Sequence, residues 1–135
     1  MTTPLDALDP ASRRTVEDYM ALCADRSAVG IGDLFTEDGG FQGAFSGGVL
    51  RGRKVIETHL RQSFRGAFSK GVLRYCGLEV RGRMVVIDWE LIQPSSKEVD
   101  PLQGRTVLEL DNQGLIQKAK ATWDPKPLMG WETPK

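Results

Sequence analysis

The sequence predicts an α+β domain in which a curved antiparallel sheet wraps around N-terminal helices and encloses a cone-shaped cavity. Apolar residues recur at helical spacing up to about residue 67, and from Gly71 onward they alternate with a period of two. Helices followed by a run of strands are typical of the α+β class. The 135 residues contain no internal repeat, so we expect one domain over 1–135, with its core at about 10–124 and a tail at 125–135.

The first helix is expected over residues 10–25, because Asp9 suits an N-cap and Pro10 suits the first helical position. A shorter helix is expected from Ala28 to Phe35, followed by the helix-ending stretch TEDGG and a short strand from Phe41 to Phe45. A second long helix is expected from Arg53 to Ala67. Its apolar arc contains Val55, Ile56, His59, Leu60, Ser63, Phe64 and Ala67.

Four strands are expected in the C-terminal half, with a loop over Pro94–Gly104 and turns at Arg81–Arg83 and Asp111–Gly114. Their expected bounds are Val72–Val80, Met84–Gln93, Arg105–Leu110 and Leu115–Trp123.

The long strand MVVIDWELI decides which face of the sheet lines the cavity. Trp89 shares one face with Val85, Ile87 and Leu91, whereas Asp88 and Glu90 share the other. Burying two carboxylates in place of these apolar side chains is costly, so we assign the acids to the outer face. The next two strands then place their own inner residues beside Trp89: Thr106, Leu108, Leu110, Leu115, Gln117, Ala119, Ala121 and Trp123.

Composition excludes several classes of function. Eighteen basic residues balance eighteen acidic ones without a basic cluster, which argues against nucleic acid and anionic membranes as partners. No apolar run approaches the ~20 residues of a membrane span, and the N-terminus lacks the apolar segment of a signal peptide. We interpret Cys23 and Cys76 as reduced core residues of a cytoplasmic protein. A single histidine and dispersed acids predict no metal site and no cofactor.

Two segments, RRTVEDYMALCADRSAVGIGDLFTEDGGF and RGRKVIETHLRQSF, resemble the SnoaL-like branch of the nuclear transport factor 2-like superfamily. The TVE-x-YM helix, the LF-x-EDG stretch and the RG-…-H helix are most similar to the phenazine biosynthesis protein A/B group. VVIDWELI and LELDNQGLIQKAKATWD fit the long strand and closing hairpin of the same family. The resemblance covers about residues 10–124 and implies a cystatin-like cone that dimerises, with a deep pocket between the sheet and the helices.

The same resemblance marks positions where this chain lacks an expected acid. SnoaL-like cyclases and epoxide hydrolases carry an aspartate, and the phenazine proteins a glutamate, where this chain has Ala121. The two catalytic aspartates of steroid isomerases align near Gly43 and Thr106. His59, in contrast, aligns with an active-site histidine of the phenazine proteins.

The candidate catalytic residues are His59 as a proton shuttle, with Tyr19 or Thr106 as hydrogen-bond donors. His59 could instead be a boundary histidine and Tyr19 a core tyrosine. Arg51 and Arg53 could attract an acidic ligand at the cavity mouth, or could only be the solvated start of a helix. The candidate ligand-binding residues share the inner face or its rim and are Trp89, Trp123, Phe41, Phe64, Gln42, Gln117, Ile87, Leu91 and Ala121.

These residues predict a cofactor-free enzyme that acts by acid–base catalysis on a cyclic, mostly apolar metabolite. Isomerisation, cyclisation, dehydration and condensation all fit. The alternative is a small-molecule-binding protein or dimeric scaffold that has lost the pocket aspartate. We expect a homodimer formed through the outer face of the sheet.

Overall fold

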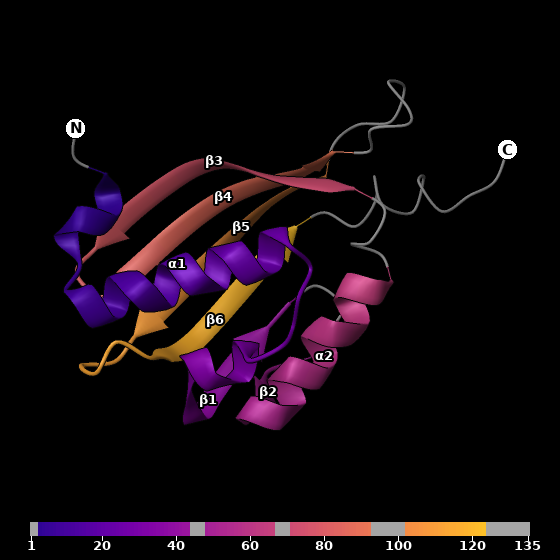
Figure 1. Ribbon diagram of the computed structural model, residues 1–135, viewed down its shortest axis with the longest axis horizontal. Helices are drawn as coiled ribbons and strands as arrows, with labels where there is room; N and C mark the ends of the chain where they lie inside the picture. The colour runs from indigo at the N-terminus through magenta and orange to yellow at the C-terminus, as the bar shows by residue number, and fades with distance from the viewer. Residues whose placement is uncertain (1–2, 44–47, 67–70, 93–101, 124–135) are drawn as a thin grey trace, which may run out of the picture.

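The computed structural model describes residues 3–43, 48–66, 71–92 and 102–123. Two helices lie against one six-stranded sheet, which curves around them (Figure 1). The elements in chain order are η1 (Pro4–Ala7), α1 (Pro10–Ala24), η2 (Ile31–Leu34), β1 (Phe35–Gln42), β2 (Leu50–Arg51), α2 (Arg53–Arg65), β3 (Val72–Arg81), β4 (Met84–Ile92), β5 (Leu102–Leu110) and β6 (Ile116–Trp123).

The sheet has the strand order β2-β1-β6-β5-β4-β3. The strands from β3 to β6 form an antiparallel meander, whereas β1 runs parallel to β6. α1 crosses the concave face of the meander, and α2 lies beside β1 and β2 (Figure 1). The predicted fold class, an α+β cone, is confirmed.

Helix α1 begins where the N-cap residue and the following proline predict it to begin. The Asp9 carboxylate accepts hydrogen bonds from the Ser12 amide at 3.3 Å and from the Ser12 hydroxyl at 2.6 Å, and Pro10 begins the helix. Val16 and Tyr19 are buried against the sheet. The predicted helix over 10–25 is therefore confirmed to within one residue.

The region after α1 differs from the prediction. The expected helix from Ala28 to Phe35 is only the single 3-10 turn η2, and the stretch TEDGG belongs to strand β1 instead of ending a helix. β1 pairs with β6, about 80 residues away, at Phe35 and again over Gly40–Gln42, with a register shift between these two parts. Gly40 and Phe41 also pair with β2. Such long-range pairing overrides the weak strand propensity of two adjacent glycines.

Helix α2 is anchored at its start by side chains that bond to backbone. Arg53 Nε donates to the Phe35 carbonyl at 2.9 Å, and the Glu57 carboxylate accepts from the Gly32 amide at 3.0 Å. Ile56 and Leu60 are buried, but Val55, which the helical wheel placed on the apolar arc, is 50% exposed. That prediction was wrong because α2 presents only a narrow stripe to the core.

Strands β3 to β6 keep the predicted alternation except at two bulges. Cys76 occupies the extra position between β3 and β4 and is exposed, so the prediction that it is a core residue was wrong. In β6, Ile116 pairs with Leu110 and Lys118 with Glu109, which leaves Gln117 as the extra residue. The bulge turns Ile116 inward and leaves Gln117 exposed.

β5 begins at Leu102, three residues earlier than predicted. The predictions for residues 44–45, 67, 93–101 and 124–135 lie outside the described residues. Within the described ranges, no helix is long and apolar enough to cross a membrane.

Candidate functional site

A pocket opens between the concave face of the sheet, the C-terminal end of α1 and the inner side of α2. Its cavity volume is about 80 Å³, several times the ~10–15 Å³ that one water molecule needs. The lining residues that the structure describes come from α1 and the residues after it, β1, α2 and β3 to β6: Tyr19, Cys23, Arg26, Phe41, His59, Leu60, Ser63, Phe64, Leu73, Tyr75, Ile87, Trp89, Leu91, Thr106, Ala121 and Trp123.

Aromatic rings form much of the pocket wall. The rings of Trp89 and Trp123 lie 5.8 Å apart with their planes tilted by 58°, and Phe41 contacts His59 at a centroid distance of 5.6 Å. Together with Ile87 and Leu91 these groups form the apolar surface that ring-shaped ligands favour.

His59 reaches the pocket from the middle of α2. Its side chain is half-buried, and this burial lowers the pKa of the imidazole below its ordinary value of 6.5. The ring is therefore neutral at pH 7 and has a lone pair with which to accept a proton. The candidate role as a proton shuttle fits this state.

Tyr19 and Cys23 stand one turn apart on α1, and both line the pocket. Burial raises the pKa of Cys23 to about 12 and that of Tyr19 well above 10. Both groups stay protonated at neutral pH. Tyr19 can thus donate a hydrogen bond but cannot serve as a base.

The buried hydroxyl of Thr106 accepts a hydrogen bond from the indole nitrogen of Trp89 at 3.0 Å. The hydroxyl keeps its own hydrogen for a further bond. Tyr75, which the sequence reasoning missed, donates from its hydroxyl to the Met20 carbonyl at 2.5 Å and so ties β3 to α1.

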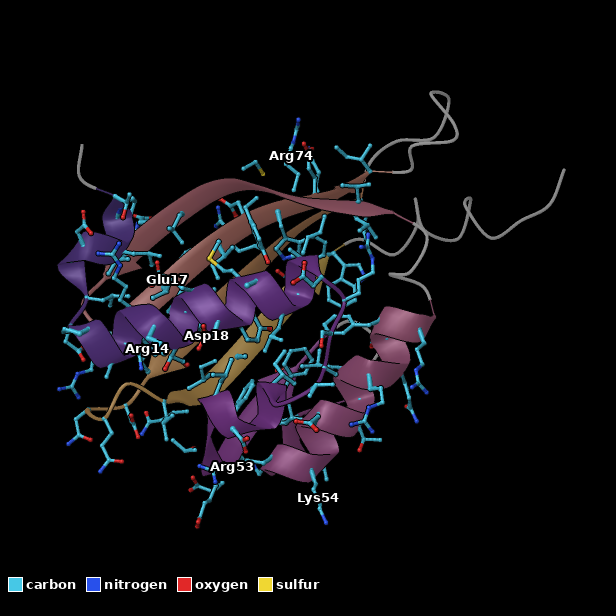
Figure 2. The ribbon with its side chains drawn as sticks, viewed as in Figure 1. Arg14, Glu17, Asp18, Arg53, Lys54 and Arg74 are labelled. Carbon is cyan, nitrogen blue, oxygen red and sulfur yellow. The ribbon has the colours of Figure 1, made fainter. Side chains whose placement is uncertain are left out.

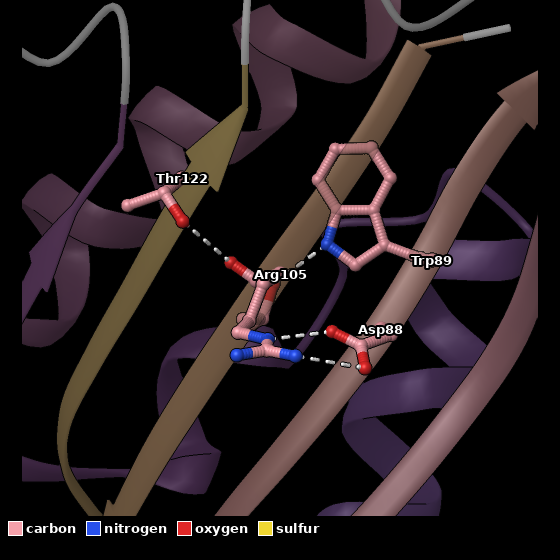
Figure 3. Close-up of polar contacts among 5 residues, drawn as sticks. Asp88, Trp89, Arg105 and Thr122 are labelled. Carbon is pink, nitrogen blue, oxygen red and sulfur yellow. Dashed lines mark hydrogen bonds and ion pairs between the residues drawn. The ribbon is translucent and has the colours of Figure 1, made fainter.

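The two carboxylates of the long strand lie on the outer face, as predicted. Asp88 pairs with Arg105 across β4 and β5, with Oδ1 2.6 Å from Nε (Figure 3). The Arg105 hydrogen bond lowers the pKa of Asp88. Glu90 pairs with Arg74 of β3, and unlike Asp88 it is buried. Neither acid lines the pocket.

The structure brings most of the predicted site residues together, from four strands and two helices. Tyr19, Phe41, His59, Phe64, Ile87, Trp89, Leu91, Thr106, Ala121 and Trp123 all line the pocket. Gln42 and Gln117 do not. Gln42 pairs in register with Lys120 and so shares its outward face, while the bulge in β6 exposes Gln117.

Arg26 and Ala121 affect the polarity of the pocket wall. Arg51 and Arg53 do not line the pocket, and Arg53 instead donates a hydrogen bond to the Phe35 carbonyl. The cationic side chain in the described wall is that of Arg26. No sequence motif marks Arg26, because it follows the helix and belongs to no periodic pattern. At position 121 the wall presents only a methyl group.

Thr106 and Gly43 are the positions where the sequence resemblance leads us to expect the acids of steroid isomerases, and both lie near the pocket. Thr106 lines the pocket, and an added Cβ at Gly43 would lie 3.2 Å from the Phe41 ring and 3.3 Å from that of Trp123. Among the described lining residues there is no carboxylate, and the described part of the chain contains no group of three or more histidine, cysteine or acidic residues that could hold a metal ion.

A scan against protein-family models finds no match, and a search of curated proteins finds no relative. Solved structures do match. A steroid delta-isomerase from Pseudomonas aeruginosa has a TM-score of 0.74 at 19% identity, covering 91% of this chain and 89% of that one. A SnoaL-like protein of unknown function from Burkholderia thailandensis has a TM-score of 0.67 at 12% identity, covering 90% and 99%.

An NTF2-like protein of unknown function from Cytophaga hutchinsonii has a TM-score of 0.63 at 14% identity, covering 87% of this chain and 94% of that one. At these identities the likeness shows the fold, which is the α+β cone of nuclear transport factor 2-like and SnoaL-like proteins. One fold supports many reactions, so the function has to be argued from the pocket.

Proposed function

We propose that this protein is a cofactor-free enzyme that isomerises, cyclises, dehydrates or condenses a cyclic, mostly apolar metabolite in the pocket, with His59 as the proton shuttle. The observation that carries the proposal is a neutral imidazole placed among aromatic walls. Solved structures of the same fold include a steroid delta-isomerase, which supports an isomerase in particular.

In this mechanism His59 removes a proton from the carbon next to a ring carbonyl. The electron pair of the broken C–H bond moves toward the carbonyl oxygen, where a hydroxyl of Tyr19 or Thr106 donates a hydrogen bond to the developing negative charge. The protonated imidazole then returns the proton to a second carbon, which shifts a double bond and regenerates neutral His59.

The test is an absorbance assay with a β,γ-unsaturated cyclic ketone, whose product is the conjugated ketone. We expect kcat/KM to fall by roughly 10²–10⁴-fold in His59→Gln. In the wild type, the rate should decline as the pH drops through a value below 6.5, because burial lowers the pKa of His59 and protonation removes the base. Thr58→Ala, at an exposed neighbouring position on α2, is the control. An unchanged rate in His59→Gln would remove this assignment.

A binding protein without catalysis is the second candidate, because the described pocket wall contains no carboxylate and Ala121 replaces the acid of similar proteins. Restoring the acid separates the two candidates. Turnover that appears only in Ala121→Asp, and in neither the wild type nor the isosteric Ala121→Asn, would favour a protein that keeps the cone and has lost the chemistry.

We also propose that, within the superfamily, this protein is most similar to the phenazine biosynthesis protein A/B group. It is supported by the position of His59, because α2 brings to the pocket the histidine on which that resemblance depends.

A further inference from the structure

The described wall of the pocket contains four side-chain hydroxyls, those of Tyr19, Ser63, Tyr75 and Thr106. Two of them use their hydrogen within the protein. Ser63 donates to the His59 carbonyl at 3.0 Å, and Tyr75 donates to the Met20 carbonyl at 2.5 Å. Because a hydroxyl has one hydrogen to donate, the hydroxyls of Tyr19 and Thr106 are left as candidate donors to a ligand.

The Thr106 hydroxyl is constrained by the indole of Trp89. Its oxygen accepts the indole N–H at 3.0 Å, and Thr106 is only 6% exposed. An indole N–H can only donate, so the hydrogen of the hydroxyl has to point away from Trp89. The structure gives this hydrogen no acceptor among the described residues. Since buried polar groups are nearly always hydrogen-bonded, its acceptor is expected to be a group that enters the pocket.

Trp89 is itself held in place. Its indole lies across Gly104, with which it pairs in register, and its ring packs against that of Trp123 at a centroid distance of 5.8 Å. The N–H is therefore aimed at Thr106 by packing on both sides. A hydroxyl that accepts one hydrogen bond is polarised and becomes a stronger donor in the next, so this contact both directs and strengthens the Thr106 donor.

The surroundings of Thr106 offer no competing polar group on the floor of the pocket. Thr106 pairs in register with Ile87 of β4 and with Ala121 of β6, and all three residues line the pocket. Ile87 and Ala121 have only hydrocarbon side chains. A single polar point on an apolar surface fixes the orientation of a ligand, because the ligand's one acceptor has to lie over it.

We propose that Trp89 is a positioning residue, which fixes the Thr106 hydroxyl as the hydrogen-bond donor to the carbonyl oxygen of a neutral ring ketone. Trp89 acts on the carbonyl only through Thr106. The inference rests on the proposed function. It selects Thr106 over Tyr19 as the group that stabilises negative charge on the carbonyl oxygen, and it names the substrate class.

The test uses 1-indanone and indane, which share a ring skeleton and differ in the carbonyl. Calorimetry measures both affinities, and infrared difference spectroscopy of isotope-labelled 1-indanone measures the carbonyl stretch. We expect the stretch to lie at lower frequency in the wild-type complex than in Thr106→Val, because a hydrogen bond weakens the C=O bond. The same variant should bind 1-indanone about tenfold more weakly, the usual cost of leaving a buried polar group without its partner, and indane unchanged.

Trp89→Phe keeps a ring in the wall but removes the N–H, so the carbonyl frequency should move part of the way toward that of Thr106→Val. Trp123→Phe is the matched control. It makes the same exchange of rings in the same pocket, and whatever it does to affinity, the carbonyl frequency should stay at the wild-type value. Thr106→Ser restores a hydroxyl and should restore the low frequency, which shows that the effect of Thr106→Val does not come from misfolding.

Three results would overturn the inference: wild type that does not bind 1-indanone, a carbonyl frequency that is the same in the wild type and Thr106→Val, or a frequency that Trp89→Phe leaves at the wild-type value. A low frequency that is lost in Tyr19→Phe alone would assign the donor to Tyr19 and have the same effect. These measurements need no turnover. An unchanged rate in His59→Gln would therefore contradict only the proton shuttle, and an unmoved carbonyl frequency only the present inference.

Discussion

The two thiols of the chain lie in opposite environments. Cys23 faces the pocket beside the Tyr19 phenol, and burial raises its pKa to about 12. Cys76 lies at the bulge of β3 and is exposed to solvent. Both are free thiols in the structure. Cys23 therefore acts as a small apolar group in the wall, whereas Cys76 is open to reagents.

We predict that iodoacetamide at pH 8 alkylates Cys76 well before Cys23. The thiolate is the reactive form, and at pH 8 a pKa of about 12 leaves roughly 2,000-fold less thiolate than an ordinary thiol of pKa about 8.5. Peptide mapping by mass spectrometry measures both rates. The Cys23 rate should still rise about tenfold per unit between pH 8 and pH 10, because its pKa lies above that range. A rate that levels off near pH 9 would contradict the raised pKa.

At the scale of elements, strands β4 and β5 fit together through a glycine. Gly104 of β5 pairs in register with Trp89 of β4, and a Cβ added there would lie 2.2 Å from the indole ring. Because Gly104 has no side chain, the Trp89 indole can pass over it and reach the hydroxyl of Thr106, which lies two residues further along β5. The position of one pocket wall thus depends on a residue with no side chain.

We predict that Gly104→Ala lowers the free energy of unfolding by about 1–3 kcal/mol, the usual cost of forcing extra volume into a packed region. Because the indole must also turn away from Thr106, ring ligands should bind more weakly. Denaturant unfolding and calorimetry measure the two effects. Gln103→Ala, an exposed neighbour in the same strand, should change neither. Wild-type stability in Gly104→Ala would show that the indole has room to move.

At the scale of the whole molecule, the two faces of the sheet carry different kinds of side chain. Its concave face carries the pocket, whereas its outer face carries the ion pairs Asp88–Arg105 and Arg74–Glu90, with Glu109 and Lys118 in register between β5 and β6. Figure 2 shows Arg74 on β3, away from the helices. This outer face is where we expect two copies of the chain to meet.

We expect size exclusion with light scattering to give twice the 14.9 kDa mass of one chain. Asp88→Lys should shift the mass toward a single chain, because it places a second cation beside Arg105 in the middle of the proposed interface. Asp18→Lys makes the same change of charge at an exposed position of α1, outside the proposed interface, and should leave the mass unchanged (Figure 2). A wild-type protein that elutes as one chain would refute the predicted dimer.

The sequence alone determined the features that rest on periodicity and local chemistry. Two-residue alternation predicted which side of β4 is buried, because exchanging the faces would bury two carboxylates. Asp9 and Pro10 determined where α1 begins, and helical spacing placed His59 toward the interior. These signals lie within one element, so no knowledge of its neighbours is needed to interpret them.

Only the tertiary structure decided the rest. β1 forms because β6 pairs with Phe35 and with Gly40–Gln42 on either side of the weak strand sequence TEDG. Gln117 is exposed because β5 and β6 shift register beside it. Arg26 reaches the pocket because the chain reverses at the end of α1. Pairings between distant segments and the geometry of helix ends depend on what packs against them, and hydrophobic periodicity carries no information about either.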